Sequence, residues 1–359
     1  MKLEVNIEKK LPNFSLKVDF CVETEVFALL GASGSGKSLT LKCIAGIEKP
    51  DKGRIVLGER VLFDSEKKIN LPARKRKVGY LFQDYALFPK MTVLENIMIS
   101  GASREEAERY LKEFRLSEKK YAYPPTLSGG QKQRTALARM LASKPELILL
   151  DEPYSALDNY LKSMLERELL SMLEKYPMPT VFVSHDRNEV YRIADKVAVL
   201  DNGKMQDVQE KNDFFKNPKS VSAARLTGCK NITALQSVDD GVFFANDWGI
   251  KLRLFDSLDM FREEKSKIEK LEKAKYAGYR AHYFIKKDVK EDYNCFDCEI
   301  IRIIEDTFST VILFKQKGYD CPEPLYWEVS KDEAEEVLKD RPGSLYLKLD
   351  STKLILLEK

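Results

Sequence analysis

An eight-residue glycine-rich segment, Gly31–Ser38, decides most about how this chain folds. It reads Gly31-Ala32-Ser33-Gly34-Ser35-Gly36-Lys37-Ser38 and fits the pattern G-x-x-x-x-G-K-[ST]. The apolar run Val26–Leu30 precedes it as a buried strand, and a helical pattern, Leu39–Ala45, follows it. Glycines here let successive backbone N–H groups face phosphate oxygens, and the helix N-terminus adds its positive dipole end. The segment therefore predicts a nucleotide phosphate site rather than a coincidental Gly/Ser-rich turn, with Lys37 on the β/γ-phosphates and Ser38 on Mg²⁺.

The first part of the chain, from Val5 to about Val208, alternates short β-rich runs with longer amphipathic stretches. This pattern is typical of βαβ units around a mainly parallel sheet. The clearest buried strands are Val26–Leu30, Val78–Phe82, Leu147–Leu150 and Thr180–Ser184. Each is followed by a polar or glycine-rich turn, which is where ligands of open α/β sheets bind. Met91–Ala142 has helical periodicity and predicts a helical insertion.

One of these strands, Leu147–Leu150, ends in two carboxylates, Asp151 and Glu152. Asp151 at the strand tip can hold Mg²⁺, and Glu152 can polarise an attacking water. The alternative is a strand capped by two acids with no chemical role. Beside a phosphate loop we favour the first interpretation.

A second turn with anion-binding chemistry is Leu127–Gln131, which follows two prolines and precedes a helical stretch. The Ser128 hydroxyl and the free N–H groups of Gly129 and Gly130 make a concavity suited to an anion. Taken alone, the segment is better explained as a helix N-cap with flexible glycines.

The order and approximate spacing of these segments and of Val183–Asp186 resemble those of the ATP-binding cassette ATPases, over essentially residues 1–228. Leu127–Gln131 matches that family's signature. By the same resemblance Gln83 is similar to the family's Q-loop glutamine. Ser155–Asp158 is similar to its D-loop. His185 is similar to its switch histidine, which contacts the γ-phosphate.

The resemblance implies an α/β P-loop NTPase fold for residues 1–228, with a RecA-like core and a helical subdomain at about residues 90–142. It also implies a composite site, in which the phosphate loop of one subunit and the signature of another enclose the same ATP in a homodimer. The implied catalytic residues are Glu152 as base, His185 and Gln83. The implied Mg²⁺ ligands are Ser38, Gln83 and Asp151. The implied ATP contacts are Gly31 to Ser38, Ser128, Gly129, Gly130, Gln131 and Asp158, with Ser128 and Gly130 acting in trans. Phe14 is the local candidate for an adenine-stacking aromatic; a core position for it is at least as good an interpretation.

Residues 229–359 have a different pattern of short strand-like runs with few helices between them. This pattern predicts a separate all-β module, for which a small barrel is one architecture. The expected strands are Val242–Ala245, Ile250–Leu254, Tyr279–Ile285, Cys298–Ile304, Thr310–Lys315, Tyr326–Val329 and Ser344–Leu349. Phe261–Lys275 is densely charged and predicts a solvated helix or loop. Gly278–Tyr283 and Leu345–Asp350 resemble the OB/TOBE-like regulatory domain of importer ATPases. Cys295 and Cys298 form a lone C-x-x-C that we interpret as reduced surface thiols.

Composition excludes several classes of protein. The 60 Lys+Arg against 57 Asp+Glu leave a net charge of +3, which argues against a protein that coats nucleic acid or anionic lipid. Accordingly, the basic run Arg74–Lys77 is interpreted as a solvated loop. No apolar run approaches the roughly 18 residues that cross a bilayer, and Met1–Val5 shows no signal-peptide core. Six cysteines in 359 residues indicate reduced thiols. We expect a soluble intracellular protein.

We therefore expect the ATP- and Mg²⁺-dependent ATPase subunit of an importer. It would be a homodimer at the cytoplasmic face of the membrane, bound to integral-membrane permease subunits. An extracytoplasmic substrate-binding protein would deliver the solute to those permease subunits. No nucleic acid is expected as a partner. In this family the region of Tyr85–Pro89 meets the permease, so Phe88 is either an exposed docking residue or a buried loop anchor.

The solute is inferred from likeness alone. The segments that look most like molybdate and sulfate ATPases are Gly53–Gly58, Val61–Ser65, Asn70–Tyr80 and Thr227–Ile232. They place molybdate or tungstate first and sulfate second. The alternatives are an importer ATPase for iron, sugars or polyamines, a soluble cassette ATPase without a transport role, and a regulatory binder that senses an oxyanion.

Overall fold

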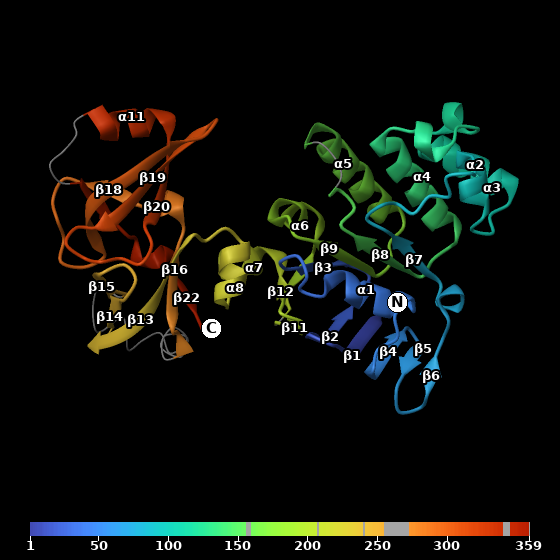
Figure 1. Cartoon of the computed structure of the whole chain (residues 1–359), viewed down its shortest axis with the longest axis horizontal. Helices are drawn as coiled ribbons and strands as arrows, with labels where there is room; N and C mark the ends of the chain where they lie inside the picture. The colour runs from blue at the N-terminus through green and yellow to red at the C-terminus, as the bar shows by residue number, and fades with distance from the viewer. Residues whose placement is uncertain (156–158, 207, 240, 255–272, 340–344, 359) are drawn as a thin grey trace. The chain divides into compact units, whose positions relative to one another are not determined.

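The computed structural model describes residues 1–155, 159–206, 208–239, 241–254, 273–339 and 345–358. The chain divides into two compact units, Met1–Lys211 and Asn212–Lys359 (Figure 1). Each unit has its own buried apolar cluster, and we describe each by itself.

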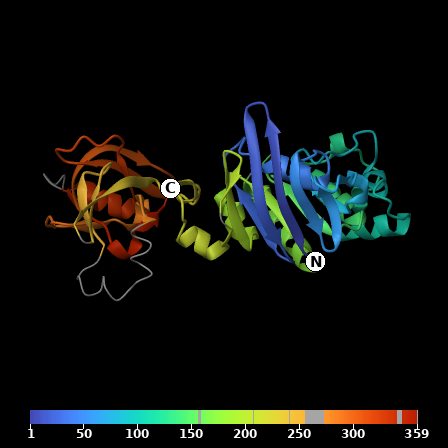
Figure 2. The same cartoon turned by 90° about the horizontal axis from the view of Figure 1, so that it is seen from below.

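The first unit is built on a twelve-stranded sheet of order β6-β5-β4-β1-β2-β11-β10-β3-β9-β8-β7, with β12 paired to β10. The strands are β1 Leu3–Leu11, β2 Phe14–Val22, β3 Val26–Leu30, β4 Lys52–Leu57, β5 Arg60–Asp64, β6 Ile69–Asn70, β7 Val78–Leu81, β8 Leu147–Asp151, β9 Thr180–Ser184, β10 Lys196–Asp201, β11 Lys204–Met205 and β12 Gln209–Glu210. β10, β3, β9, β8 and β7 pair in parallel. The expected parallel sheet is thus confirmed at its centre, and an antiparallel arm of β1, β2, β4, β5 and β6 extends it. Figure 2 shows β1 and β2 as a long hairpin.

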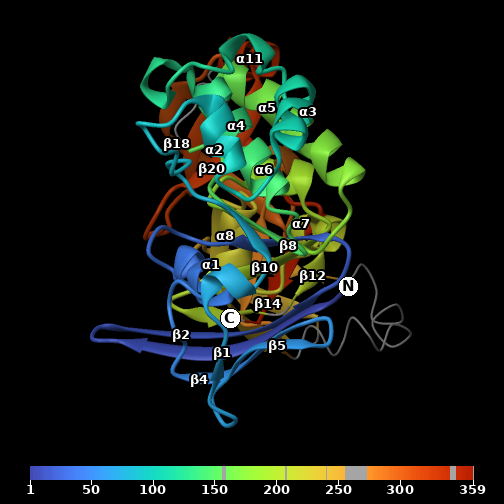
Figure 3. The same ribbon diagram turned by 90° about the vertical axis from the view of Figure 1, so that its right-hand side faces the viewer.

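The helices of this unit are α1 Lys37–Ala45, α2 Val93–Met98, α3 Arg104–Glu113, α4 Gly129–Ala142, α5 Asn159–Lys175 and α6 Arg187–Ile193. α2, α3 and α4 fall in the segment expected to be helical and lie together, away from β1, β2 and β4 (Figures 1 and 3). Each of the three begins with a capping box, from Thr92, Ser103 and Ser128 respectively. No helix within the described ranges is both long and apolar enough to span a membrane.

The second unit contains two five-stranded sheets, of order β15-β14-β13-β16-β22 and β17-β21-β18-β19-β20. The strands are β13 Asn231–Asp239, β14 Val242–Ala245, β15 Ile250–Arg253, β16 Tyr276–Tyr279, β17 Ile285–Lys287, β18 Cys295–Glu305, β19 Ser309–Gln316, β20 Leu325–Ser330, β21 Leu345–Lys348 and β22 Ile355–Leu357. Within the described residues, the helices that follow the first unit are α7 Lys211–Lys216, α8 Val221–Leu226 and α11 Lys331–Lys339. The expectation of a β-rich C-terminal module is confirmed.

Two sequence expectations for the second unit need correction, and a third concerns residues that mostly lie outside the described ranges. Tyr279–Ile285 is not one strand: β16 ends at Tyr279, and a 3₁₀ turn, Ala281–Tyr283, separates it from β17. The Tyr279 hydroxyl donates to the Tyr283 carbonyl and thus braces this turn. Cys295 and Cys298 are buried rather than surface thiols, and burial raises the Cys298 pKa above its ordinary value. Most of the charged segment Phe261–Lys275 lies outside the described residues.

The two units divide after Lys211, earlier than the expected boundary at residue 228. The reason is local packing, since Ala224 of α8 is buried with Cys229, Ile355 and Leu357. The helix therefore belongs to the β-rich unit.

The basic run Arg74–Lys77 is not uniformly solvated, because Arg76 is 0% exposed. Its guanidinium donates to the carbonyls of Cys43 and Ile44, which end α1, and to the Leu71 carbonyl and Asn70 Oδ1. The Cβ of an alanine at Gly46, the left-handed C-cap of α1, would lie 2.5 Å from Arg76 Nε. Arg76 thus holds the end of the helix that the glycine-rich segment begins.

Candidate phosphate and catalytic site

The predicted phosphate loop lies between β3 and α1 and is shaped by two of its glycines. A Cβ on Gly31 would lie 2.3 Å from the Leu200 carbonyl oxygen, so only glycine fits there. Gly36, the N-cap of α1, has φ 105°, in the left-handed region that other residues avoid. The loop therefore passes directly into a helix N-terminus, the geometry that binds phosphate.

Lys37 opens α1, and its side chain folds back over the loop. Its ammonium donates to the carbonyls of Gly31 and Ala32 at 2.8 and 2.9 Å. The residue is 4% exposed, and burial lowers the Lys37 pKa, partly opposed by the charges of Glu152 and Asp151. In the same loop the Ser35 hydroxyl is buried without a hydrogen-bond partner in the described structure. A buried cation and an unpaired hydroxyl fit a loop that binds phosphate oxygens.

Ser38 and Asp151 meet although 113 residues separate them. The Ser38 hydroxyl donates to Asp151 Oδ1 at 2.7 Å, and the Tyr80 hydroxyl donates to Asp151 Oδ2 at 2.8 Å. A hydroxyl and a carboxylate are the oxygen ligands that Mg²⁺ prefers, so this pair fits the ion. The sequence gives no signal for the role of Tyr80, because this residue stands inside an apolar strand pattern. Its pKa is raised by burial and by the Asp151 charge, which keeps the hydroxyl neutral as a donor.

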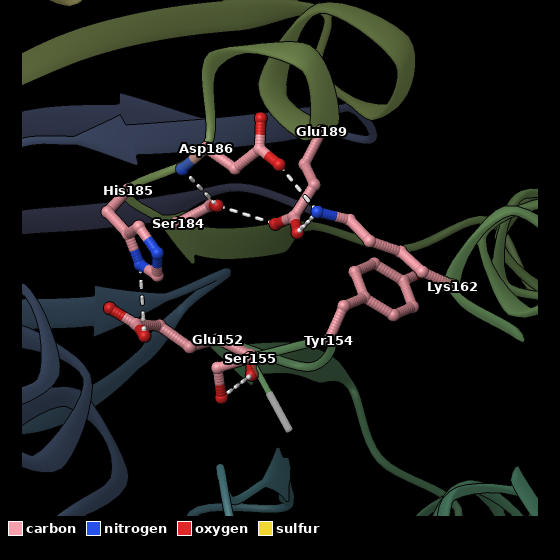
Figure 4. Close-up of a pocket in the computed structure, with 8 residues that line it drawn as sticks. All are labelled: Glu152, Tyr154, Ser155, Lys162, Ser184, His185, Asp186 and Glu189. Carbon is pink, nitrogen blue, oxygen red and sulfur yellow. Dashed lines mark hydrogen bonds and ion pairs between the residues drawn. The ribbon is translucent and has the colours of Figure 1, made fainter. Parts of the chain in front are cut away.

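Glu152 and His185 face one another from the ends of β8 and β9 (Figure 4). His185 Nδ1 lies 3.2 Å from Glu152 Oε2. Glu152 has φ 45°, a backbone conformation that costs a non-glycine residue on the order of 1 kcal/mol or more. Strain of this kind persists where the surrounding structure enforces a side-chain position, here beside the phosphate loop.

A cavity of about 130 Å³ adjoins this pair. Its walls include Tyr154, whose buried hydroxyl has no partner in the described part of the chain. On the far wall Lys162 contacts Asp186 and Glu189 (Figure 4). Burial alone would lower the Lys162 pKa, but the hydrogen bonds that Lys162 donates to Asp186 and Glu189 raise it above its ordinary value. The cavity has room for about four water molecules among polar walls.

The Leu127–Gln131 turn forms the N-terminus of α4. The Ser128 hydroxyl accepts from the Gln131 N–H, and Gln131 Oε1 accepts from the Ser128 N–H. Ser128 is exposed, and Gly129 and Gly130 make the first turn of the helix. The N-cap interpretation is thus confirmed, and the N-terminus of a helix keeps its capacity for an anion.

The remaining predicted residues lie as follows. Gln83 follows β7 and is exposed. Asp158 lies outside the described residues. Phe14 begins β2, half-buried, and its ring lies so close to Gly36 that an added Cβ there would be 2.9 Å away. The structure thus brings Lys37, Ser38, Asp151, Glu152 and His185 to one edge of the sheet, because β3, β9 and β8 are parallel neighbours.

Comparison with known proteins gives a family match. The family model described as ABC transporter matches residues 14–155. The Fe(3+) ions import ATP-binding protein FbpC of Haemophilus influenzae is 41% identical over 57% of this chain and 60% of its own length. The chain therefore spans about three fifths of that relative. The spermidine/putrescine import ATP-binding protein PotA of Pasteurella multocida is 36% identical over 72% of this chain and 70% of its own. The molybdate/tungstate import ATP-binding protein WtpC of Pyrococcus horikoshii is 39% identical over 65% and 68%.

Solved structures agree with these sequence matches. The ATP-binding cassette MJ0796, a dimer in a post-hydrolysis state bound to ADP and Pi, superposes with a TM-score of 0.50 at 29% identity. The match covers 59% of this chain and 99% of that one. The ADP conformation of the ATP-binding cassette MJ1267 superposes with a TM-score of 0.53 at 24% identity, over 61% and 96% of the two chains, and shows the shared fold.

Proposed function

The chain belongs to the family of import ATP-binding proteins of ABC transporters, and from this premise we propose that it hydrolyses ATP to drive uptake of a solute through a separate permease. The observation that carries the proposal is the meeting of two pairs at one sheet edge, Ser38 with Asp151 and Glu152 with His185. The first pair suits an ion-bound phosphate and the second suits activation of water.

In this proposal the phosphate loop binds the triphosphate with its backbone N–H groups and the Lys37 ammonium. Ser38 and Asp151, together with Gln83, would hold Mg²⁺. The ion supplies positive charge that stabilises the transferring phosphoryl group. Glu152 accepts the proton of the attacking water, and His185 keeps that carboxylate oriented and contacts the γ-phosphate. Most of the acceleration then comes from positioned charge.

We further propose that hydrolysis requires two copies of the chain. The Ser128–Gln131 turn is a second anion-binding feature, on a different element from the phosphate loop. Two anion-binding turns in one copy are more than one triphosphate needs. The dimeric state of MJ0796 with ADP and Pi supports a two-chain arrangement. In it Ser128, Gly129, Gly130, Gln131 and Asp158 would complete the site of the other copy.

The proposed docking residue for the permease is Phe88. Its side chain is 45% exposed although large and apolar. Its backbone N–H and carbonyl are both hydrogen-bonded by the buried Asn96, and the Arg139 guanidinium lies 5.7 Å from its ring centre. An exposed aromatic on a held backbone is suited to bind a protein partner. This arrangement favours docking over the alternative of a buried loop anchor.

For the solute we propose an oxyanion, molybdate or tungstate before sulfate. The support is the likeness of Gly53–Gly58 and Asn70–Tyr80 to molybdate-type ATPases, together with the 39% identity to a molybdate/tungstate relative. Relatives named for iron and for polyamines match at 41% and 36%, so overall identity does not separate these solutes. Iron, sugars and polyamines remain the alternatives.

Two experiments test the proposal. The purified chain should hydrolyse ATP with Mg²⁺, and Glu152→Gln should lower kcat by roughly 10²- to 10⁴-fold while ATP binding persists. Glu174→Gln, on an exposed position of α5, is the matched control and should retain wild-type turnover. Wild-type turnover in Glu152→Gln would remove that residue from the role of base.

The second experiment addresses transport. Uptake of labelled molybdate and sulfate is compared between cells with the wild-type chain, with Lys37→Ala and with Phe88→Glu. Both variants should lose uptake, but Phe88→Glu should keep basal ATP hydrolysis. Loss of sulfate uptake alone would correct the solute. No change in the uptake of either oxyanion would refute the oxyanion assignment and direct the search to iron, sugars or polyamines.

A further inference from the structure

On the cavity wall opposite Glu152, one lysine ammonium contacts two carboxylates. Lys162, in the first turn of α5, is 16% exposed and places its ammonium 2.5 Å from both Asp186 Oδ2 and Glu189 Oε1. Glu189 is almost fully buried. Two carboxylates that converge in a partly buried site repel one another unless a cation neutralises them. A lysine suits this position because its three N–H donors can serve two acceptors at once.

The two carboxylates belong to the loop that carries His185. Asp186 follows His185 directly, and its Oδ1 accepts from the Asn188 N–H at the start of α6. The Asp186 N–H donates to the Ser184 hydroxyl, which donates in turn to Glu189 Oε2. The residues on both sides of His185 are therefore tied to Lys162, directly or through one hydrogen bond (Figure 4).

His185 itself depends on this support for its placement. Its side chain is 59% exposed, and its contact with Glu152 spans 3.2 Å. An exposed imidazole keeps one orientation only when its backbone is held. A displacement of about 1 Å at a catalytic group can cost roughly 100-fold in rate.

We propose that Lys162 is a positioning residue, which holds the Ser184–Glu189 segment so that the His185 imidazole faces Glu152. The expected effect of Lys162 on the rate rests on the proposed ATP hydrolysis. Its expected effect on the orientation of His185 rests on the geometry alone. Lys162 is not a catalytic residue, because it acts through Asp186 and Glu189.

The test compares Lys162→Met with a matched control on the same two helices. Arg192 of α6 forms a bidentate ion pair with the buried Glu166 of α5, at 2.6 and 2.8 Å, and Arg192→Met removes it. Each variant removes one cationic side chain. Lys162 links α5 to Asp186 and Glu189, and Arg192 links α6 to Glu166 of α5. Lys162→Met should lower kcat for ATP roughly 10-fold or more while the Kd for ATP stays within about twofold. Lys162→Arg should recover most of the rate. Arg192→Met should lower Tm comparably but leave kcat within about twofold of wild type.

A second readout does not depend on hydrolysis. The chain has two histidines, so the variant His282→Gln leaves His185 as the single imidazole in nuclear magnetic resonance spectra. In that background Lys162→Met should shift and broaden the His185 ring signals, and Arg192→Met should not. Unchanged ring signals in Lys162→Met, or a kcat that follows Tm across all variants, would overturn the positioning role. Absence of hydrolysis by the wild type would refute the proposed function, while the ring signals would still decide the role of Lys162.

Discussion

The Tyr80 hydroxyl donates a 2.8 Å hydrogen bond to Asp151 Oδ2, and Ser38 holds the other oxygen of the same carboxylate. β7 and β8 are parallel neighbours, which brings the tyrosine of one strand beside the terminal aspartate of the next. Both oxygens are thereby oriented before any ion binds. The carboxylate that we propose for Mg²⁺ binding is thus preorganised by Tyr80, which belongs to none of the sequence motifs.

Tyr80→Phe should lower the free energy of unfolding by about 1.5–3 kcal/mol, because it removes a half-buried hydrogen bond to a charged group. Urea denaturation followed by circular dichroism, without nucleotide, measures this loss. Tyr176→Phe deletes the same atom where the hydroxyl contacts Glu113 at 3.1 Å near the surface, and should cost less. If both variants lose the same free energy of unfolding, the Asp151 contact stabilises the fold no more than the surface contact of Tyr176 does.

Arg76→Met should destabilise the first unit by about 3 kcal/mol or more. The substitution leaves the carbonyls of Cys43, Ile44 and Leu71 without the donor that they have in the wild type. Arg74→Met, two residues away and exposed, should change stability by less than about 0.5 kcal/mol. Thermal unfolding by circular dichroism separates the two. Similar Tm values for both variants would contradict the capping role of Arg76.

Asp186 should make stability depend on pH in acid. Burial by itself would raise its pKa, but hydrogen bonds from Lys162 and from the Asn188 N–H lower it below the ordinary value. A carboxyl group with a lowered folded-state pKa stabilises the fold above its unfolded pKa, near 3.9, and this contribution disappears as the pH falls through the folded pKa. The stability difference between wild type and Asp186→Asn should therefore be largest above about pH 5 and shrink toward pH 3. Urea denaturation across this range measures it, and a difference independent of pH would refute the assignment.

Asn96→Ala should loosen the segment that presents Phe88. The wholly buried Asn96 amide accepts from the Phe88 N–H and donates to the carbonyls of Phe88, Met91 and Thr92. Without it, amide hydrogen exchange over residues 84–92 should rise roughly 10-fold or more. Asn6→Ala, which removes an exposed side-chain contact to Asp19, should leave this segment unchanged. Unchanged exchange in Asn96→Ala would show that other contacts hold the loop.

Three features could be predicted from sequence: the phosphate loop, the strands around it and the acidic strand end. Each depends on a short continuous segment of the chain. Glycine spacing, apolar runs and a polar residue directly after a strand reflect local backbone geometry. The family resemblance added the order of these segments. The helical segment with α4 and the change to a β-rich module were also predictable, since the periodicity of side chains changes there.

Contacts between distant segments were decided by the tertiary structure. The antiparallel arm, the partner of Tyr80, the burial of Arg76 and the bridge from Lys162 depend on which strands and helices become neighbours. Nothing in the run Arg74–Lys77 distinguishes its third cation, yet that residue alone reaches the carbonyl end of α1. By itself the sequence determined which segments carry phosphate and acid chemistry, because backbone conformation is a local property. The tertiary structure determined which side chains orient that chemistry, because those contacts exist only once the strand order β3-β9-β8-β7 is formed.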